Sequence, residues 1–349
     1  MGARKRRAAL TVAVKHGALR RSEGLCRLTQ PRFISDAETD AGLTPSLLLG
    51  TVEDALAGLA SGAVINGGKV SVTLDDADGA RTLIAMVGVV PGRHVAGVKW
   101  VGTFNRNVER DLPRAPATLL LTDSVTGALR AVIEATSLTA RRTAAALVVA
   151  AKCFDRKPRR VAILGFGAIG RSLVPLIVAA FAPATIAVWG GRRERLTADA
   201  AQLQAAHGVT IAVAGSPEEA VREAGVVFTA SGLAEDRPFV TRAMLSDDAV
   251  VCCAGSYQEI ADDVVHASEC LVADDWVNCQ KRGNLAAMVK RGALARESVA
   301  MELPTLVAQA RAGGLPIARL PVVVMIGLGA LDVAIGAALV AGTAGRPSP

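Results

Sequence analysis

Aromatic residues, histidines and paired cysteines are scarce in this sequence. Phe, Trp and Tyr make up 3% of its 349 residues, and only one tyrosine is present. The four histidines are scattered, and no two of the six cysteines are separated by two residues. Zinc sites usually depend on such cysteine pairs or on closely spaced histidines, so we expect no metal site. We interpret the cysteines as buried, reduced thiols of a cytoplasmic protein.

The body of the chain also lacks an excess of charge. The formal net charge is +7, but residues 1–21 contain seven of the 39 Lys and Arg residues and no acid, so 32 basic residues face 32 acidic ones in the remainder. Nucleic-acid binding would require a basic surface on the folded body, so we expect no nucleic-acid partner. We interpret residues 1–30 as a basic, disordered extension, or alternatively as a targeting or interaction arm. No apolar stretch typical of a secretory signal follows the charges.

One apolar stretch, residues 321–342, is long enough to resemble a membrane span. Asp332 lies in its middle, and four glycines interrupt it. A charge at mid-membrane is costly, so we expect no membrane insertion. The pattern instead predicts a strand over 321–326, a glycine turn and a buried helix from about Ala330.

The predicted elements divide the chain into two parts. The first contains a helix over 43–59 and is otherwise rich in antiparallel strands between 70 and 133. From residue 139, a helix is followed by alternating strands and helices up to 273, which is typical of a doubly wound parallel sheet. We predict an α/β fold: a Rossmann domain over 139–304, and an α+β substrate-binding and dimerisation domain formed by 31–138 and 305–349.

A glycine-rich segment, Gly-Phe-Gly-Ala-Ile-Gly at 165–170, follows a predicted strand and opens a predicted helix. In such a loop, Gly165 permits the tight turn, Gly167 allows a pyrophosphate to approach the backbone, and Gly170 lets the helix pack close to the strand. The free N–H groups of the helix start attract phosphates. The segment therefore predicts dinucleotide binding by Gly165, Gly167, Ala168, Ile169 and Gly170. The alternative is a glycine turn that binds nothing.

The second strand of this domain ends without an acidic residue. A carboxylate at this point usually holds the ribose 2′-hydroxyl of NAD, but here two glycines follow Trp189 and lead to Arg192 and Arg193. Two guanidinium groups can pair with a 2′-phosphate, so the sequence favours NADP over NAD as the cofactor. Alternatively, the two arginines are solvated residues at a helix start.

Two basic residues occupy unusual positions. Lys99 lies within an apolar strand, where burial would lower its pKa and allow it to exchange protons near neutral pH. The alternative is a solvated lysine on an edge strand. Arg142 heads an Ala-rich helix, against the preference of the helix dipole, which suggests that it holds an anionic ligand there.

Four segments occur in the order found in one enzyme family: Gly97–Trp100, Arg142–Ala145, the loop at 165–170, and Gly327–Asp332. In these segments the chain resembles the ornithine cyclodeaminase/μ-crystallin family over about residues 33–340. Further similarity is to the branch that makes 2,3-diaminopropionate for siderophores and peptide antibiotics. The residues that carry it are Arg114, Glu134–Ser137, Ala273–Trp276 and Cys279.

The resemblance implies an NAD(P)-dependent oxidoreductase. Lys99 would be the active-site lysine, Arg142 would bind the substrate carboxylate, and Arg114 and Ser256 would contact the substrate. The branch reaction is oxidative hydrolysis of N-(2-amino-2-carboxyethyl)-L-glutamate to 2,3-diaminopropionate and 2-oxoglutarate. The alternatives are an ornithine cyclodeaminase, a ketimine or imine reductase, and a non-catalytic NADP-dependent binding protein of μ-crystallin type. A homodimer joined through residues 31–135 is also expected.

The chain departs from the family pattern at two positions. Ser256 stands where the cyclodeaminases place an aspartate, and the arginine expected upstream of Lys99 is absent. Lys69 could replace that arginine as a point charge but not as a bidentate ligand. The group that activates water is not identified by the motifs, and Glu259, Asp275 and Asp332 are the candidates.

Overall fold

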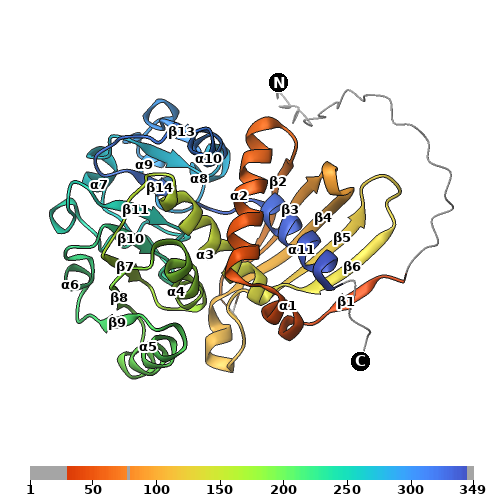
Figure 1. Cartoon of the computed structure of the whole chain (residues 1–349), viewed down its shortest axis with the longest axis horizontal. Helices are drawn as coiled ribbons and strands as arrows, with labels where there is room; N and C mark the ends of the chain where they lie inside the picture. The colour runs from red at the N-terminus through yellow and green to blue at the C-terminus, as the bar shows by residue number, and fades with distance from the viewer. Residues whose placement is uncertain (1–29, 77–78, 344–349) are drawn as a thin grey trace. The chain divides into compact units, whose positions relative to one another are not determined.

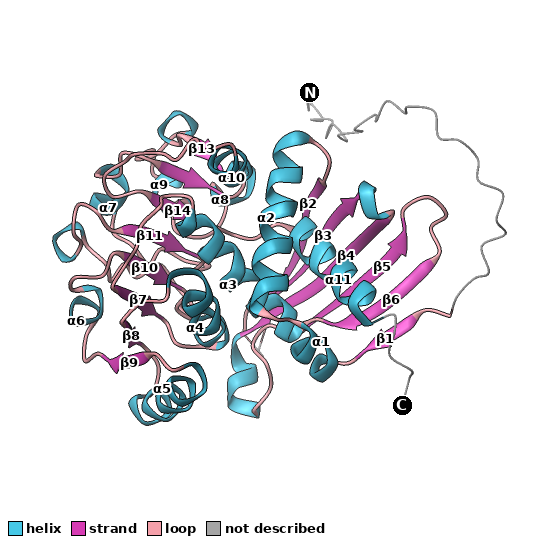
Figure 2. Cartoon of the chain, in the orientation of Figure 1, coloured by secondary structure: helices cyan, strands magenta, loops and turns pink. Residues whose placement is uncertain are grey.

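Two β-sheets organise the part of the chain that the structure describes. The computed structural model describes residues 30–76 and 79–343. Apart from Gln30, the predicted basic extension lies outside these residues, as does Cys26. One sheet has six strands and is mainly antiparallel, and the other has eight parallel strands (Figure 1, Figure 2). This confirms the predicted α/β class with a doubly wound parallel sheet.

The six-stranded sheet has the order β1-β6-β5-β4-β3-β2, and only the β1–β6 pair is parallel. Its strands are β1 (Arg32–Ile34), β2 (Ile65–Leu74), β3 (Arg81–Val90), β4 (Val95–Phe104), β5 (Ala117–Asp123) and β6 (Leu129–Glu134). The segments associated with it are α1 (Asp36–Gly42), α2 (Pro45–Ser61), α11 (Gly329–Thr343) and the short 3₁₀ turns η1 (Pro91–Arg93) and η2 (Asn105–Arg110).

Helices cover one face of this sheet. The helix α11 packs on it, against β3, β4 and β5, and α2 packs against α11 (Figure 1). Because side chains alternate along a strand, Lys99 and Leu119 point into this buried layer, whereas the neighbouring Trp100 points to the other face and is 50% exposed. Val87 and Val70, which share the face of Trp100, are also exposed. The uncovered face is therefore apolar.

The eight-stranded sheet has the order β13-β12-β14-β11-β10-β7-β8-β9. Its strands are β7 (Arg160–Leu164), β8 (Thr185–Trp189), β9 (Thr210–Val213), β10 (Val226–Thr229), β11 (Val250–Cys253), β12 (Leu271–Ala273), β13 (Met301–Glu302) and β14 (Val322–Val324). Its helices and 3₁₀ turns are α3 (Thr136–Lys152), α4 (Ala168–Phe181), α5 (Arg193–His207), α6 (Pro217–Val221), η3 (Arg242–Met244), α7 (Asp262–His266), α8 (Trp276–Cys279), α9 (Ala286–Lys290), η4 (Arg296–Ser298) and α10 (Leu303–Arg311).

Both faces of the parallel sheet are buried. Val161 and Ile163 of β7 belong to the core that includes α3 and α4, whereas Ala162 and Leu164 belong to a second core on the opposite face. A strand buried on both faces reads as a continuous apolar run, which is the pattern that the sequence shows. The first core extends without interruption to α2, α11 and the six-stranded sheet.

The strand after Pro321 was predicted to return to the first domain with the helix that follows it, and for the strand this is wrong. β14 pairs in parallel with β11 and β12, inside the eight-stranded sheet. The short run Val322–Val324 is buried on both faces, as an inner parallel strand requires. Only α11 packs on the six-stranded sheet. The chain therefore passes from one sheet to the other between β14 and α11.

The described cysteines are all unpaired and buried, in agreement with their interpretation as reduced thiols. Burial raises the pKa of Cys153 to about 12, so its thiol is not reactive at neutral pH. None of the described helices is long and apolar enough to span a membrane.

Candidate functional site

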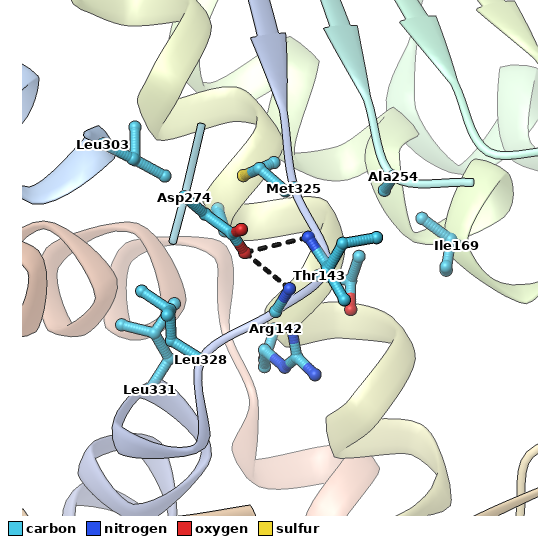
Figure 3. Close-up of a pocket in the computed structure, with 12 residues that line it drawn as sticks. Arg142, Thr143, Ile169, Ala254, Asp274, Leu303, Met325, Leu328 and Leu331 are labelled. Carbon is cyan, nitrogen blue, oxygen red and sulfur yellow. Dashed lines mark hydrogen bonds between the residues drawn. The ribbon is translucent and has the colours of Figure 1, made fainter. Parts of the chain in front are cut away.

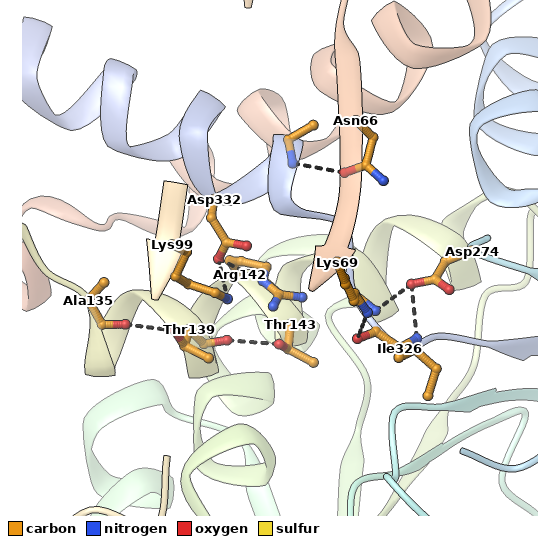
Figure 4. A network of polar contacts seen from close by, with 12 residues as sticks. Asn66, Lys69, Lys99, Ala135, Thr139, Arg142, Thr143, Asp274, Ile326 and Asp332 are labelled. Carbon is orange, nitrogen blue, oxygen red and sulfur yellow. Dashed lines mark hydrogen bonds and ion pairs between the residues drawn. The ribbon is translucent and has the colours of Figure 1, made fainter. Parts of the chain in front are cut away.

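A buried ion cluster lies where the chain passes from one sheet to the other. Lys99 Nζ donates a hydrogen bond to Asp332 Oδ1 at 2.8 Å, and Arg142 Nε donates to the same oxygen at 3.0 Å (Figure 4). The three residues come from β4, α11 and α3 and are 0%, 0% and 4% exposed. We call Lys99, Arg142 and Asp332 the central cluster.

Burial changes the protonation behaviour of Lys99. The pKa of Lys99 is lowered to about 7, chiefly because the amine is removed from water and also because the charge of Arg142 is near, while Asp332 opposes both effects. The alternative of a solvated edge lysine is wrong, because β4 is an inner strand and Lys99 is fully buried. An amine with this pKa can accept or donate a proton near neutral pH.

Arg142 does not lie at the start of its helix. The helix α3 begins at Thr136, three residues earlier than predicted, so Arg142 belongs to the second turn. Its position is explained by the ion pair with Asp332 rather than by a ligand at the helix end. Its guanidinium also faces the β14–α11 loop: Gly327 has a φ of +94°, and a Cβ there would lie 2.5 Å from Arg142 Nη1. Glycine is therefore required at this position.

The Oδ2 atom of Asp332 is buried and has no hydrogen-bond partner among the described residues. Leaving a buried acceptor unpaired costs about 1–3 kcal/mol. A ligand or water that donates a hydrogen bond at this point would recover that free energy. The oxygen is therefore a position at which a hydrogen-bond donor would be favoured.

Lys69 lies close to the central cluster. The strand register places Lys69 opposite Met86 and Met86 opposite Lys99, so both lysines lie in one row on the same face. Lys69 Nζ donates to the carbonyl oxygen of Ile326 at 2.9 Å. Burial lowers the pKa of Lys69, and the nearby carboxylate of Asp274 opposes this shift. The structure thus brings together three of the residues that the sequence analysis named, Lys69, Lys99 and Arg142.

Asp274 organises the loop that joins β14 to α11. Its Oδ2 atom accepts hydrogen bonds from the N–H groups of Ile326 at 2.9 Å and Gly327 at 2.5 Å, and Cys279 donates to its Oδ1 atom. Asp274, Ile326 and Gly327 also line a cavity of about 90 Å³ beside Arg142 (Figure 3). Asp274 therefore shapes the wall of the site as well as its electrostatics.

The other predicted substrate contacts form a separate group. Ser256 follows β11 and accepts a hydrogen bond from Arg282 Nη2 at 3.0 Å. Arg114 follows η2 and donates from Nε to Asn105 Oδ1 at 2.9 Å and from Nη2 to the carbonyl oxygen of Leu233 at 3.3 Å. Among the described residues, neither Ser256 nor Arg114 forms a hydrogen bond or ion pair with the central cluster. The predicted substrate-binding residues are thus divided between two places.

The glycine-rich loop has the geometry expected of a dinucleotide site. Gly165 has a φ of +103°, and a Cβ there would meet the backbone of Ala230 at 2.5 Å. A Cβ on Gly167 would meet nothing within 4 Å, so the space above the N-terminus of α4 is open. Gly167 caps this helix without a side-chain hydrogen bond, which leaves the first N–H groups of the helix available to a phosphate. These residues fit a dinucleotide.

Arg192 and Arg193 lie at the end of β8, beyond two glycines with positive φ. Arg192 is the N-cap of α5 and Arg193 is its first residue. Both side chains are exposed, and neither forms an ion pair with a described carboxylate. Their position allows contact with a ribose phosphate at the carboxyl edge of the sheet.

Comparison with known proteins places the chain among related enzymes. The sequence profile of the ornithine cyclodeaminase/mu-crystallin family matches residues 30–328. The chain belongs to this family. The N-((2S)-2-amino-2-carboxyethyl)-L-glutamate dehydrogenase of Staphylococcus aureus is 27% identical over 282 residues, which are 78% of this chain and 83% of that protein.

Two solved structures have the same fold. The Thermococcus litoralis Δ1-pyrroline-2-carboxylate reductase, in complex with NADH and L-proline, has a TM-score of 0.82 at 21% identity and covers 89% of this chain and 97% of its own. An archaeal alanine dehydrogenase dimer with bound NAD has a TM-score of 0.79 at 22% identity, with coverages of 90% and 96%. Membership of this family confirms the prediction of an NAD(P)-dependent enzyme acting on a carbon–nitrogen bond.

Three carboxylates were candidates for activating water, and two of them already accept hydrogen bonds from neighbouring protein groups. Glu259 accepts hydrogen bonds from Thr229 Oγ1 at 2.5 Å and from the N–H and hydroxyl of Ser231. Asp275 is the N-cap of α8 and accepts from the N–H and amide group of Asn278. Asp332 keeps one oxygen without a partner. The geometry therefore favours Asp332.

Sequence reasoning missed Asp332 as the partner of Lys99 and missed Arg282 altogether. Asp332 had a signal, because a charge inside a long apolar run requires a buried partner. Arg282 had none. It follows the short helix α8 in a stretch without periodicity, and only the contact with Ser256 reveals its position.

Proposed function

We propose that this enzyme catalyses the oxidative hydrolysis of N-(2-amino-2-carboxyethyl)-L-glutamate to 2,3-diaminopropionate and 2-oxoglutarate. The family match shows that the chain is an NAD(P)-dependent oxidoreductase of the ornithine cyclodeaminase/mu-crystallin family. The similarity to the staphylococcal dehydrogenase supports the substrate. The observation that carries the proposal is the central cluster, in which a lysine with a pKa near 7 and an arginine share one buried carboxylate oxygen.

Arg142 and Lys69 would hold the carboxylate on the carbon that is oxidised. Only Nε of Arg142 is used by Asp332, so the two terminal nitrogens remain for a bidentate contact with a ligand carboxylate. Lys69 would add a point charge from β2, in the same row of the sheet as Lys99. Arg142 and Lys69 would thus place two basic groups on one ligand carboxylate.

Lys99 and Asp332 would manage the protons. Oxidation of the secondary amine to an imine releases the proton of the amine nitrogen, and neutral Lys99 would accept it. Bound NAD(P) supplies the two-electron oxidant for this step. Asp332 Oδ2 would then accept a hydrogen bond from the water that adds to the imine carbon. Cleavage of the resulting carbinolamine breaks the carbon–nitrogen bond and yields the primary amine and the oxo acid.

The loop at Gly165–Gly170 and the N-terminus of α4 would hold the pyrophosphate. Arg192 and Arg193 would hold a 2′-phosphate, and we therefore propose that NADP is bound at least as well as NAD. No carboxylate at the end of β8 is present to repel this phosphate, because Trp189 is followed by Gly190 and Gly191.

A homodimer formed through the uncovered face of the six-stranded sheet is part of the proposal. Apolar side chains on that face are exposed, with Val70 at 72%, Phe33 at 65% and Trp100 at 50%. Exposed apolar surface of this kind usually marks an interface, and the same strand face on a second copy would cover it. Light scattering at micromolar concentration should give the mass of a dimer. The double variant Val70→Lys, Trp100→Lys should shift it to a monomer.

Turnover tests the reaction. The purified enzyme, incubated with N-(2-amino-2-carboxyethyl)-L-glutamate and NADP or NAD, should raise absorbance at the reduced-nicotinamide band and release 2-oxoglutarate and 2,3-diaminopropionate, as identified by mass spectrometry. Proline or ammonia formed from L-ornithine would contradict the proposal in favour of a cyclodeaminase. Reduction of a cyclic imine without turnover of the proposed substrate would favour a reductase. Nucleotide binding without any turnover would favour a binding protein.

A further inference from the structure

Two arginines near the site have no carboxylate partner. Arg114 and Arg282 are both half-buried, and neither forms an ion pair within the described residues. Their hydrogen bonds go to neutral acceptors: Asn105 and the carbonyl oxygen of Leu233 for Arg114, and the Ser256 hydroxyl for Arg282. We call Arg114 and Arg282 the arginine pair. Two partly desolvated cations without an anion are an unfavourable arrangement in the free protein.

The loops that the two arginines contact are joined to each other. Arg114 donates to the carbonyl oxygen of Leu233, and Arg237 of the same loop donates its N–H to the carbonyl oxygen of Gln258 at 3.1 Å, two residues after the Ser256 that Arg282 contacts. Burial lowers the pKa of Arg114, the charge of Arg282 lowers it further, and Tyr257 opposes these effects. Burial likewise lowers the pKa of Arg282, and Tyr257 again opposes it. Tyr257 is therefore near both arginines, beside Ser256. Like charges brought together under partial burial favour binding of an anion between them.

The arginine pair adjoins the cavity of the central cluster. Gly283, next to Arg282, donates its N–H to the carbonyl oxygen of Ser256 at 3.1 Å, and a Cβ on Gly283 would meet Ile326 Cδ1 at 2.3 Å. Ile326 lines the cavity beside Arg142 and accepts the hydrogen bond from Lys69. Ala254, two residues before Ser256, lines the same cavity. Ser256 and Arg282 therefore lie beside two residues, Ala254 and Ile326, that form the wall of this cavity.

We infer that Arg114 and Arg282, together with Ser256 and Tyr257, form a second carboxylate subsite that selects amino acids with an additional acidic arm. This inference rests on the proposed function, because it takes Arg142 and Lys69 to hold the carboxylate at the reacting carbon. Each guanidinium keeps at least one nitrogen that donates no hydrogen bond within the described part of the chain, and Arg282 donates only from Nη2. The hydroxyl groups of Ser256 and Tyr257 can donate to the same carboxylate.

The subsite would also exclude basic substrates. An ornithine molecule held by its carboxylate at Arg142 would direct its terminal ammonium toward two guanidinium groups. Ser256 cannot offset that repulsion, because its hydroxyl carries no negative charge. A glutamate arm of similar reach would instead neutralise the arginine pair. The preference for an acidic arm thus comes from attraction to one substrate class and repulsion of the other.

A binding measurement separates this inference from the proposed reaction. With cofactor present, 2-oxoglutarate and 2-oxopentanoate are titrated by calorimetry; the two oxo acids differ only in the distal carboxylate. The enzyme should bind 2-oxoglutarate at least about tenfold more tightly, a difference of about 1.4 kcal/mol. Arg282→Gln and Arg114→Gln should each reduce that ratio toward one, and Arg282→Lys should keep part of it. Lys281→Ala, an exposed neighbour, is the matched control and should leave the ratio unchanged.

The outcomes are distinct. If both arginine variants retain their cofactor affinity and also keep the full ratio, the second subsite is wrong even when N-(2-amino-2-carboxyethyl)-L-glutamate is turned over. If the ratio depends on the arginine pair but that compound is not oxidised, the subsite stands and the proposed reaction fails. If wild-type enzyme binds the two oxo acids equally, the inference is overturned directly.

Discussion

The central cluster and the arginine pair are both groups of buried or half-buried cations, but only one contains its own anion. Asp332 accepts hydrogen bonds from Lys99 and Arg142, so the central cluster is largely compensated within the protein. The arginine pair has only neutral acceptors among the described residues. The first group is arranged to persist without ligand and to exchange protons. The second gains its counter-charge only when an anion binds.

The difference also predicts how each group contributes to the fold. Removing one partner of a buried ion pair leaves the other charge uncompensated, which is strongly unfavourable. Removing one of two like charges relieves repulsion instead. The central cluster should therefore contribute to both stability and turnover. The arginine pair should contribute to ligand selection, and it should leave the free energy of unfolding unchanged or lower it slightly.

The largest expected effect concerns Lys99. The variant Lys99→Ala should reduce kcat by about 10²–10⁴-fold, which is typical of losing a general acid or base. Cofactor affinity should change little, because Lys99 is on β4 and the glycine-rich loop follows β7. Small primary amines added to the variant should restore part of the rate. Lys152→Ala on the surface of α3 is the control, and a Lys99 variant with more than half of the wild-type rate would remove the lysine from the mechanism.

Stability provides the sharpest contrast between the two groups. Asp332→Ala should lower the free energy of unfolding by about 3–5 kcal/mol, because Lys99 and Arg142 lose their shared carboxylate. Arg282→Gln should change it by no more than about 0.5 kcal/mol, or raise it. Urea denaturation followed by circular dichroism measures both. Similar losses for the two variants would mean that a structural anion compensates the arginine pair.

The pH dependence tests the charge balance of the central cluster. Since burial lowers the pKa of Lys99 to about 7, its neutral form should predominate above that pH, and kcat/KM for oxidation should fall as the pH drops through about 7. The residual activity of Lys99→Ala should lack this ionisation. The same shift predicts that wild type gains stability as the pH rises above 7, because the unfolded chain then binds more protons than the folded one. A profile identical in wild type and variant would assign the ionisation to another group.

The smallest expected effect concerns exposed cations. Arg192 and Arg193 are solvated, so their contact with a 2′-phosphate is screened by water. The double variant Arg192→Ser, Arg193→Ser should weaken NADP binding by about tenfold and leave NAD binding unchanged. Arg195→Ser, on the same helix, is the matched control. A wild-type enzyme that prefers NAD by tenfold or more would make both arginines ordinary surface residues.

Much of the site could be predicted because its signals are local. The loop at 165–170, the lysine within an apolar strand and the charge within the run at 321–342 each stand out against their immediate neighbours. The placement of the strand after Pro321 could not be predicted in this way. A run of three valines fits an inner strand of either sheet, and only pairing with β11 and β12 decides between them.

By itself, the sequence determined the alternation of strands and helices, the cofactor loop and the identity of the unusual basic residues, because these depend on hydrogen bonding and side-chain periodicity within a few residues. Only the tertiary structure decided which charges meet. Lys99 and Asp332 are 233 positions apart, and they pair because α11 packs across β4 after the chain has left the parallel sheet. Arg114 and Arg282 likewise come from separate parts of the chain, one from a loop beside the six-stranded sheet and the other from a loop beside the eight-stranded sheet. No local pattern encodes such a meeting, since it depends on how two sheets and their helices are packed together.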